Sequence, residues 1–510
     1  MATLTFRLSK SNSLLDVPKQ KSPRASTSAK AASTSAERLE CFLKDWPKTI
    51  WIQLYWWDYA YTIDRRAITI DDFRDSLKHG RPYEVGKCHY SPPSRTQSWM
   101  STNNDSMANV EVALSVIPDL GSLKPFAGNE EMASVFCYWK DDYHPPKHPS
   151  GEEQGPGPVE ELQVLGNTLS TMCPRASLRR AELAASRAGL KIQLGIEFDY
   201  VVINPLSLKM PPFVGTQELV VAPVYPRGEE PWRVPYRYVS DLVMQVRAKL
   251  EQSKIDIREW GPVNSEKGHT QIKVKLEPQS PLVAIDAFIY ARDSIRDLFS
   301  RRSWAASLQT SPGRMTDMFR LHISVHSQEN AAHVIHKESY DGSEHFLAGM
   351  LDHLPGLCAL GKSTTLSYFT PGNARPWPGQ AISWGTGNHH ATIRIIEPHH
   401  WEIKPVDALA PLPLMAAGYI FSGLDGVRRC MKPTYQELLF NPEALLPTSA
   451  PPMLPGNIVE AIDALRRDAL LTEKLGPHAL DFFTFCVKDM IAYTRTLTPM
   501  QASHYLALRL

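Results

Sequence analysis

The chain has 510 residues, more than a single hydrophobic core usually serves, so we expect two domains or one large domain with a smaller partner. Its hydrophobic fraction of 43% and charged fraction of 21% are typical of a globular protein. A formal net charge of +1 gives no electrostatic reason to expect nucleic acid or a membrane surface as a partner, so small molecules or other proteins are the expected partners.

Residues 1–36 are predicted to form a disordered tail. From residue 10 onward this segment is rich in Ser, Lys, Ala and Thr and poor in acids, a composition that also suits a transit peptide. The pair Leu14-Leu15 is followed at once by polar and basic residues, unlike the apolar core of a secretory signal, and no apolar run reaches membrane-spanning length. The seven cysteines are odd in number and lack CxxC spacing, which favours a reducing compartment. We therefore expect a cytoplasmic protein.

The first ordered region is predicted to be a sheet-rich domain at residues 37–150. Residues 50–57 (IWIQLYWW) have the β-branched and aromatic content of a strand, and residues 110–117 and 133–139 are similar runs closed by turn residues. The segment that follows is loaded with Pro, Gly and charge, which neither a helix nor an interior strand sustains. We place a linker at 151–170 and a second domain at 171–510.

The second domain has an α+β pattern. Residues 176–188 are mostly good helix formers, and Gly189 stands where a helix end favours a residue tolerant of positive φ. Strand-like and helix-like runs then alternate without an internal repeat. The predicted strands are 191–203, 271–276, 321–326 and 392–396, and the predicted helices are 280–300, 412–422 and 458–469.

Glu197 and Asp199 form the clearest chemical motif. They lie two residues apart on a predicted strand, and strand geometry directs such side chains to the same face. Apolar residues surround the pair, and carboxylates avoid burial unless they are paired or bind a metal. Divalent-cation binding is therefore one interpretation and a solvated strand face is the other.

Six segments follow one another along the chain: Cys173-Pro174-Arg175, Gly195-Ile196-Glu197-Phe198-Asp199, Glu266 to Lys273, Phe319 to Ser324, Leu366 to Arg394 and Glu402-Ile403-Lys404 with the helix to Gly426. In this order they resemble the catalytic domain of the glutamine synthetase family. The corresponding family segments are its Pro-Arg turn and helix, its acidic strand, its Glu…Gly-x-Gly-Gln-x-Glu segment, its Met-His-x-His-x-Ser segment, its Ser-Tyr…Trp-Gly…Asn-Arg…Arg segment and its Glu-x-Arg segment.

The resemblance implies a small N-terminal β-grasp-like domain and a large catalytic domain with an antiparallel sheet and flanking helices. For the N-terminal domain the support is limited to Asp58 and Pro118-Asp119. In this family, divalent metals hold ATP and a carboxylic acid, the acid becomes an acyl phosphate, and an amine displaces the phosphate. The family also assembles as double rings, so a homo-oligomeric double ring is implied.

Residue roles can be carried over by position. The resemblance implies that Asp199 and Glu266 bind a first Mg²⁺ or Mn²⁺ and that Glu197 and Glu402 bind a second. Substrate and nucleotide roles follow in the same way. His322 would hold the carboxylic acid, Arg394 and His389 would line the nucleotide site, and Lys404, Arg375 and Trp377 would contact substrate.

Several positions depart from the family pattern. Lys273 stands where the family has a third carboxylate on the first metal, and Arg320 stands where it has the histidine on the second. A lysine ammonium about 4 Å from a divalent ion would be repelled by roughly 8 kcal/mol at an effective dielectric constant of 20. Fixed cations are therefore expected to replace one or both metals.

Other departures concern the substrates. Lys404 replaces an arginine and cannot make that residue's two-pronged bond to a carboxylate. Thr370 stands where the family usually has another arginine. One extra residue before Trp377 would allow Arg375 to take that arginine's place. Trp377 falls near the place of the flap glutamate that accepts ammonium's proton in bacterial enzymes. An amine larger than ammonium is therefore expected.

The histidine pairs His389-His390 and His399-His400 suggest a zinc cluster. Adjacent histidines on a strand point to opposite faces, however, and no cysteine accompanies them, which argues against zinc.

Three hypotheses follow for the function. The first is an ATP-dependent ligase that joins a carboxylic acid to an amine. The second is a metal-free catalyst in which Lys273 or Arg320 acts directly on the substrate. The third is a non-catalytic regulatory or developmental scaffold.

Overall fold

The structure is a computed structural model. It describes residues 35–57, 59, 63–85, 114–140, 162–203, 236–263, 271–308, 319–327, 342–368, 381–435, 437–438 and 452–497. The predictions for Asp58, Glu266, Thr370, Arg375 and Trp377 lie outside these residues.

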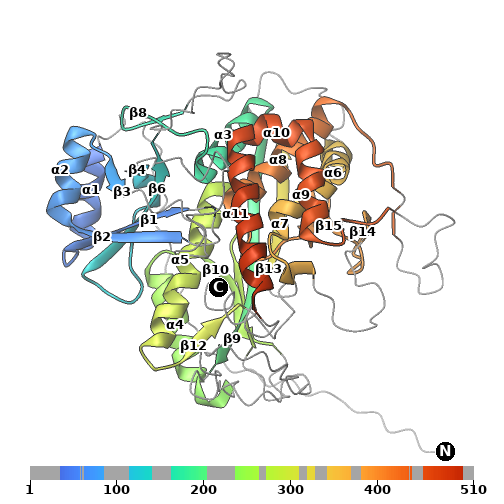
Figure 1. Ribbon diagram of the computed structural model, residues 1–510. Coiled ribbons are helices and arrows are strands. Elements are labelled where there is room, and N and C mark those ends of the chain that lie inside the picture. The colour runs from blue at the N-terminus through green and yellow to red at the C-terminus, as the bar shows by residue number, and fades with distance from the viewer. Residues whose placement is uncertain are drawn as a thin grey trace, which may run out of the picture.

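The N-terminal part is a mixed six-stranded sheet with two helices, drawn in blue and teal in Figure 1. Strand β1 (Trp51–Trp57) lies antiparallel to β2 (Ile63–Thr69) and parallel to β6 (Met132–Trp139), which confirms the predicted strands at 50–57 and 133–139. Of the run predicted at 110–117, the described part forms β4 (Leu114–Pro118). The remaining elements are β3 (Tyr83–Val85), β5 (Lys124–Pro125), α1 (Ser35–Asp45), α2 (Ile70–His79) and the short 3-10 turn η3 (Leu120–Ser122).

The C-terminal part is built on an eight-stranded sheet in the order β10-β11-β9-β13-β16-β15-β14, with β12 beside β9. Every pairing is antiparallel except that of β14 with β15. The strands are β9 (Leu190–Ile203), β10 (Ile257–Pro262), β11 (Gln271–Leu276), β12 (Ala305–Ser307), β13 (Phe319–Ser327), β14 (Trp384–Thr386), β15 (Ile393–Glu397) and β16 (His400–Ile403). The four strands predicted in this domain are therefore confirmed.

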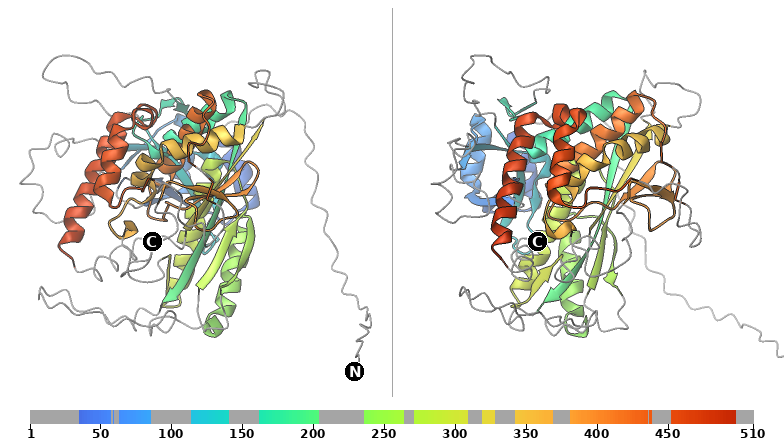
Figure 2. Two further views of the ribbon diagram at one scale, coloured as in Figure 1. Left: turned by 90° about the vertical axis from the view of Figure 1, so that its right-hand side faces the viewer. Right: turned by 45° about the vertical axis from the view of Figure 1, so that its right-hand side comes forward.

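One face of this sheet is apolar and covered by helices. Along β11 the buried residues Ile272, Val274 and Leu276 alternate with half-buried polar ones, as expected for a strand with one covered face. Phe288 of α5 (Pro281–Ser300) packs edge-on against Phe198 of β9, with ring centroids 5.0 Å apart. Figure 2 shows these helices on one side of the long β9 strand. The polar side chains of the sheet therefore gather on its other face.

The other covering helices are α3 (Pro174–Arg187), α6 (Gly342–Asp352), α7 (Leu354–Gly361) and α8 (Leu412–Arg428). Helix α3 confirms the prediction at 176–188, and Gly189 has the expected positive φ of 74°. The helix predicted at 458–469 is two helices, α9 (Ile458–Arg467) and α10 (Ala469–Leu475), because Asp468 caps α10 by accepting the Leu471 amide. Helix α11 (Pro477–Arg495) follows, and Figure 1 draws these last three helices in red. The chain also contains α4 (Ser240–Gln252), the 3-10 turns η5 (Tyr236–Tyr238) and η7 (Leu366–Tyr368), and a hairpin of β7 (Gln163–Val164) and β8 (Asn167–Thr168) within the predicted linker.

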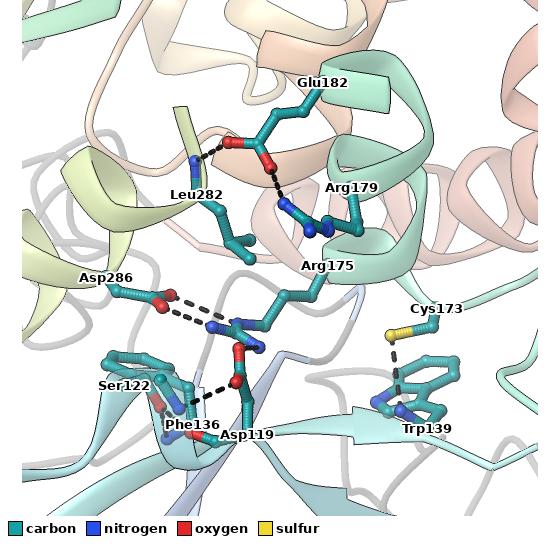
Figure 3. A network of polar contacts seen from close by, with 11 residues as sticks. Asp119, Ser122, Phe136, Trp139, Cys173, Arg175, Arg179, Glu182, Leu282 and Asp286 are labelled. Carbon is teal, nitrogen blue, oxygen red and sulfur yellow. Dashed lines mark hydrogen bonds and ion pairs between the residues drawn. The ribbon is translucent and has the colours of Figure 1, made fainter. Parts of the chain in front are cut away.

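A buried arginine joins the N-terminal part to helices of the C-terminal part (Figure 3). Arg175 of α3, 1% exposed, donates from Nη1 to Oδ2 of Asp119, 2.8 Å away, and from Nη2 to Asp286 of α5. Its guanidinium also lies 4.5 Å from the centroid of the Tyr138 ring. We call Asp119, Arg175 and Asp286 the clamp. It borders a cavity of about 480 Å³, and it links segments far apart in the sequence.

Candidate functional site

The polar face of the eight-stranded sheet carries a cluster of charged residues. Strand register places Lys273 opposite Asp199, Arg320 opposite Glu197, and both His322 and Arg394 opposite Glu402. Cross-strand partners share a face, so the prediction that Glu197 and Asp199 lie on one surface is confirmed. The cluster comprises Glu197, Asp199, Lys273, Lys275, Arg320, His322, Arg394, His400 and Glu402.

Glu197 is the centre of three cations. Its Oε1 accepts from Nη1 of Arg320 at 2.5 Å and lies 3.1 Å from Nζ of Lys273, and its Oε2 lies 3.8 Å from Nζ of Lys275. Burial alone would raise the pKa of Glu197, but the charges of Arg320 and Lys273 outweigh it and the pKa is lowered. Each cationic side chain is about 30% exposed, so all three remain accessible to a ligand.

Asp199 is buried and only half satisfied. Its Oδ2 accepts from Nε2 of Gln271 at 2.8 Å, while within the described part of the chain its Oδ1 has no hydrogen-bond partner. Burial raises the pKa of Asp199, although the bond from Gln271 and the Arg320 charge act against it. A buried acceptor without a partner is costly, which makes this oxygen a candidate contact for a ligand.

Glu402, the third carboxylate of the cluster, is 3% exposed and accepts a hydrogen bond from Nη2 of Arg394. Nη1 of Arg394 lies 2.6 Å from Nδ1 of His389, and Lys404 donates to the His389 carbonyl. Partial burial, with the charges of Arg394 and Lys404, lowers the pKa of His389. The structure thus brings Arg394, His389, Lys404 and Glu402 into contact with one another.

His322 is 5% exposed and pairs with a second histidine. Its Nδ1 lies 3.1 Å from Nε2 of His400 on the neighbouring strand. Burial, and next the proximity of His400 and Lys275, lowers the pKa of His322 to about 3. His322 is therefore neutral near neutral pH. Nε2 of His322 and Nε of Arg394 are both buried without a hydrogen-bond partner among the described residues.

The residues at the predicted second metal site do not fit a divalent ion. Glu197 is neutralised by Lys273 and Arg320, and Glu402 by Arg394, so both carboxylates already have cationic partners. Within the described ranges, no group of three or more His, Cys, Asp or Glu side chains is placed to hold a metal. Of the predicted first site, Asp199 lies on the polar face and Glu266 is outside the described residues. The cluster is better suited to an anion than to a second metal.

Some residues of the cluster were not predicted from the sequence. Lys275 shares a face with Lys273 because it lies two residues further along β11, and the same alternation places Gln271 beside Asp199. The two-residue alternation of side chains along a strand was sufficient to predict both positions. His400 was considered only as half of a zinc pair.

The strand positions assumed for the histidine pairs are partly wrong. His389 and His390 lie in a turn, and His399 has a φ of 63°, outside strand geometry. Only His400 of the four is on a strand, β16. The hairpin between β15 and β16 bends at His399, and this turn brings Glu397 beside His400.

The structure thus has a small mixed sheet followed by a larger, mostly antiparallel sheet with one charged face and one face covered by helices. This sequence and fold can be compared with those of known proteins. The family description "Glutamine synthetase, catalytic domain" matches residues 171–505, more than half of the chain. The chain belongs to the glutamine synthetase family. Its fold is the glutamine synthetase-type catalytic fold with a small N-terminal domain, as the sequence predicted, and the altered cluster marks it as a diverged member.

Individual relatives are distant. Protein fluG of Emericella nidulans is 24% identical over 459 residues, covering 88% of this chain and 47% of its own length, so this chain spans about half of that protein. The gamma-glutamylpolyamine synthetase GlnA3 of Streptomyces coelicolor is 28% identical over 333 residues, covering 61% of this chain and 67% of that protein. The solved structure of a GmaS/ADP complex aligns with a TM-score of 0.65 at 17% identity, covering 90% of this chain and 97% of that one. None of the described helices is long and apolar enough to span a membrane.

Proposed function

We propose that this protein is an ATP-dependent ligase that forms an amide between a carboxylic acid and an amine larger than ammonium. Family membership supports the ligase class. The observation that carries the binding of ATP and a carboxylic acid is the set of three accessible cations, Lys273, Lys275 and Arg320, around Glu197.

Lys273, Lys275 and Arg320 would hold anionic oxygens. Three of the cations gather around the single carboxylate of Glu197, so positive charge is in excess at that point of the polar face. Fixed cations in a partly enclosed site stabilise phosphate and carboxylate charge without reorganisation. When bound, ATP supplies the phosphoryl group that activates the acid. Arg394, whose Nε has no hydrogen-bond partner in the described part of the chain, and His389 would contact the nucleotide.

The carboxylic acid would approach the same cations. Lys404 would offer a single point charge because its ammonium lacks the two-pronged geometry of arginine. Arg375 and Trp377 remain proposed substrate contacts from sequence alone. Because the second metal site does not fit the residues present, Lys273 and Arg320 are proposed to take over the charge neutralisation that the metal provides in the family.

A polyamine is the amine class that we favour. The relative GlnA3 is named for gamma-glutamylpolyamine synthesis. Loss of the flap glutamate position to Trp377 removes a group suited to ammonium, and a tryptophan there would suit the methylene chain of a longer amine. We also propose the domain boundaries 37–150 and 171–510. We further propose assembly into a homo-oligomeric double ring, and light scattering on a sizing column would test this assembly.

The test is an assay of ADP and phosphate release with saturating ATP and a matrix of acids and amines, with ammonium as the reference amine. We expect at least one organic amine, with glutamate or another acid, to stimulate release about tenfold more than ammonium does. Absence of release with every pair, or ammonium as the best amine, would contradict the proposal.

The bonding of Glu197 to two cations also favours a second candidate, a metal-free catalyst in which Lys273 or Arg320 acts on the substrate itself. The double variant Lys273→Glu with Arg320→His distinguishes the two. Improved ligase activity favours the ligase, whereas abolished activity favours chemistry built on the cations. If neither the original chain nor the double variant binds ATP or shows activity, the scaffold hypothesis remains.

A further inference from the structure

The cavity beside the clamp, about 480 Å³ in volume, lies between the N-terminal part and the helices α3 and α5. Helix α3 lines it with Arg175, Arg179, Glu182 and Leu183, which follow one another at helical spacing and so share one face of that helix (Figure 3). The turn η3 with its capping residue Asp119, the first turn of α5 and the hairpin of β7 and β8 supply the other walls. A cavity of this size is large enough for a small organic molecule.

The charged residues around this cavity are balanced in number. Among the described residues, three cations and three carboxylates line it, namely Lys124, Arg175, Arg179, Asp119, Glu182 and Asp286. Balanced charge disfavours a ligand with a net charge but suits one that carries both signs. Apolar side chains complete the wall, namely Leu162, Val164, Leu169, Leu183, Leu282 and Val283. The lining therefore matches a small zwitterion that also has an apolar part.

Two of the charged groups are accessible and retain bonding capacity. The side chain of Asp119 is 24% exposed, and it accepts from the Gly121 amide at 3.0 Å and from Arg175 at 2.8 Å, whereas a carboxylate can accept about four hydrogen bonds. Burial alone would raise the pKa of Asp119, but Arg175 outweighs it and the pKa is lowered, so Asp119 is ionised near neutral pH. Arg179 is 49% exposed, and within the described part of the chain only its Nη1 has a partner, the carboxylate of Glu182.

The other charged groups of the lining are bonded within the protein. Glu182 accepts from Arg179 at Oε2 and from the Leu282 amide at Oε1, each over 3.0 Å. Nζ of Lys124 donates to the Lys254 carbonyl, 3.1 Å away. The clamp accounts for the remaining pair. Charge-assisted bonds to a ligand therefore fall to one carboxylate and one guanidinium.

We propose that this cavity binds a free amino acid with an apolar side chain, whose ammonium bonds Asp119 and whose carboxylate bonds Arg179. Arg175, which holds Asp119, precedes Arg179 by one turn of α3, roughly 6 Å along the axis, so the two groups are spaced for the two charges of one small molecule. The site goes beyond the proposed function, because α3 and α5 cover the apolar face of the eight-stranded sheet and the charged cluster lies on the other face. A bound amino acid would connect the N-terminal part to α3 beside the clamp.

Calorimetric titration of the 510-residue protein without ATP tests the ligand class. The probes are leucine, isoamylamine, which is leucine without its carboxylate, and isocaproate, which is leucine without its ammonium. We expect leucine to bind at least about tenfold more tightly than either analogue, as for loss of one hydrogen bond to a charged group. No leucine binding at millimolar concentration, or equally tight binding of an analogue, would overturn the proposal. Because ATP is left out, this result does not depend on the outcome of the ligase assay.

Variants locate the binding in the cavity. Arg179→Gln removes the partner of the carboxylate, so leucine should bind at least about tenfold more weakly while isoamylamine binds as before. Arg187→Gln, at the exposed end of α3 and outside the lining, is the matched control. Val283 is 40% exposed, so Val283→Phe should place a ring in the cavity and abolish leucine binding, whereas Val283→Ala should retain it. Equal leucine affinities of the two arginine variants, equal losses of leucine and isoamylamine in Arg179→Gln, or unchanged binding by Val283→Phe would contradict the site.

Discussion

Two arginine–carboxylate clusters of the protein differ in how exposed their cations are. In the clamp, Arg175 is 1% exposed and is shared between Asp119 and Asp286. On the polar face, the cations that surround Glu197 are about 30% exposed, and nearby buried atoms lack partners within the described residues.

That difference separates a structural cluster from a candidate site. An ion network around a buried arginine holds segments in register, and removing its charge leaves buried carboxylate oxygens unpaired. A cluster with accessible cations and unsatisfied atoms retains interactions for a ligand. The two clusters should therefore respond in opposite ways to substitution, one through stability and the other through binding.

The largest expected effect is on the clamp. Arg175→Leu removes the cation that bonds the buried carboxylate of Asp286 and the partly buried carboxylate of Asp119, and should destabilise the protein by about 3–5 kcal/mol, the usual cost of breaking a buried pair. The shift in the urea midpoint measures it. Arg179→Leu on the same helix, where the arginine is 49% exposed and paired with Glu182, is the control and should cost at most about 1 kcal/mol. Equal shifts would remove the distinction between the clusters.

Metal binding should change sharply on the polar face. Lys273→Glu with Arg320→His removes two positive charges and restores both family ligand types, so Mn²⁺ should bind at least about tenfold more tightly than to the original chain. Calorimetric titration of Mn²⁺ measures this. Equally tight binding by the original chain would show that Lys273 and Arg320 do not exclude the ion.

Asp199 should make a smaller contribution to binding. Asp199→Asn keeps the side-chain shape but replaces one oxygen with a donor, so a ligand that donates to Oδ1 should bind about three- to tenfold more weakly. The amine and acid that support turnover are the ligands to titrate. Ser324→Ala on the same face is the control, since Ser324 lies opposite His400 and away from Asp199. If Asp199→Asn binds the amine and the acid as tightly as the original chain, Oδ1 of Asp199 contacts neither ligand.

The smallest effect concerns pH and lies away from both clusters. Nδ1 of His353 lies 2.7 Å from Oδ2 of Asp468, and the bonds to Asp468 and Asp425 outweigh burial, so the pKa of His353 is raised. Its stabilising contribution is full below the ordinary histidine pKa of about 6.5 and is lost as pH rises through the raised value. His353→Gln should therefore lower the urea midpoint more at pH 6 than at pH 9. The opposite order would contradict this assignment.

Local patterns predicted the sheet and its covering helices well. The alternation through Gln271, Lys273 and Lys275 defines β11, and the helix formers before Gly189 define α3. A helix was predicted to run through Asp468, however, because its periodicity is continuous. A short acidic side chain can instead cap a new helix, as Asp468 does for α10. Whether the first helix continues or a new one begins depends on how the segment packs in the folded protein.

The site was predictable residue by residue but not in its pairings. The resemblance singled out Glu197, Lys273 and Arg320, and the structure shows that both cations contact the Glu197 carboxylate. That they replace a metal stays a prediction. The clamp and the Glu397–His400–His322 chain were not predicted. Each joins residues whose contact depends on strand order or on a turn at positive φ, which no local sequence pattern specifies.

The most direct test of the account is calorimetric titration of ATP into the purified protein, first with EDTA and then with Mg²⁺ or Mn²⁺. If fixed cations replace the second metal, ATP should bind in EDTA, and adding a metal should tighten binding by less than about tenfold. Binding that disappears without metal, or no binding at all at millimolar ATP, would contradict the claim that Lys273, Lys275 and Arg320 form the anion site of a ligase.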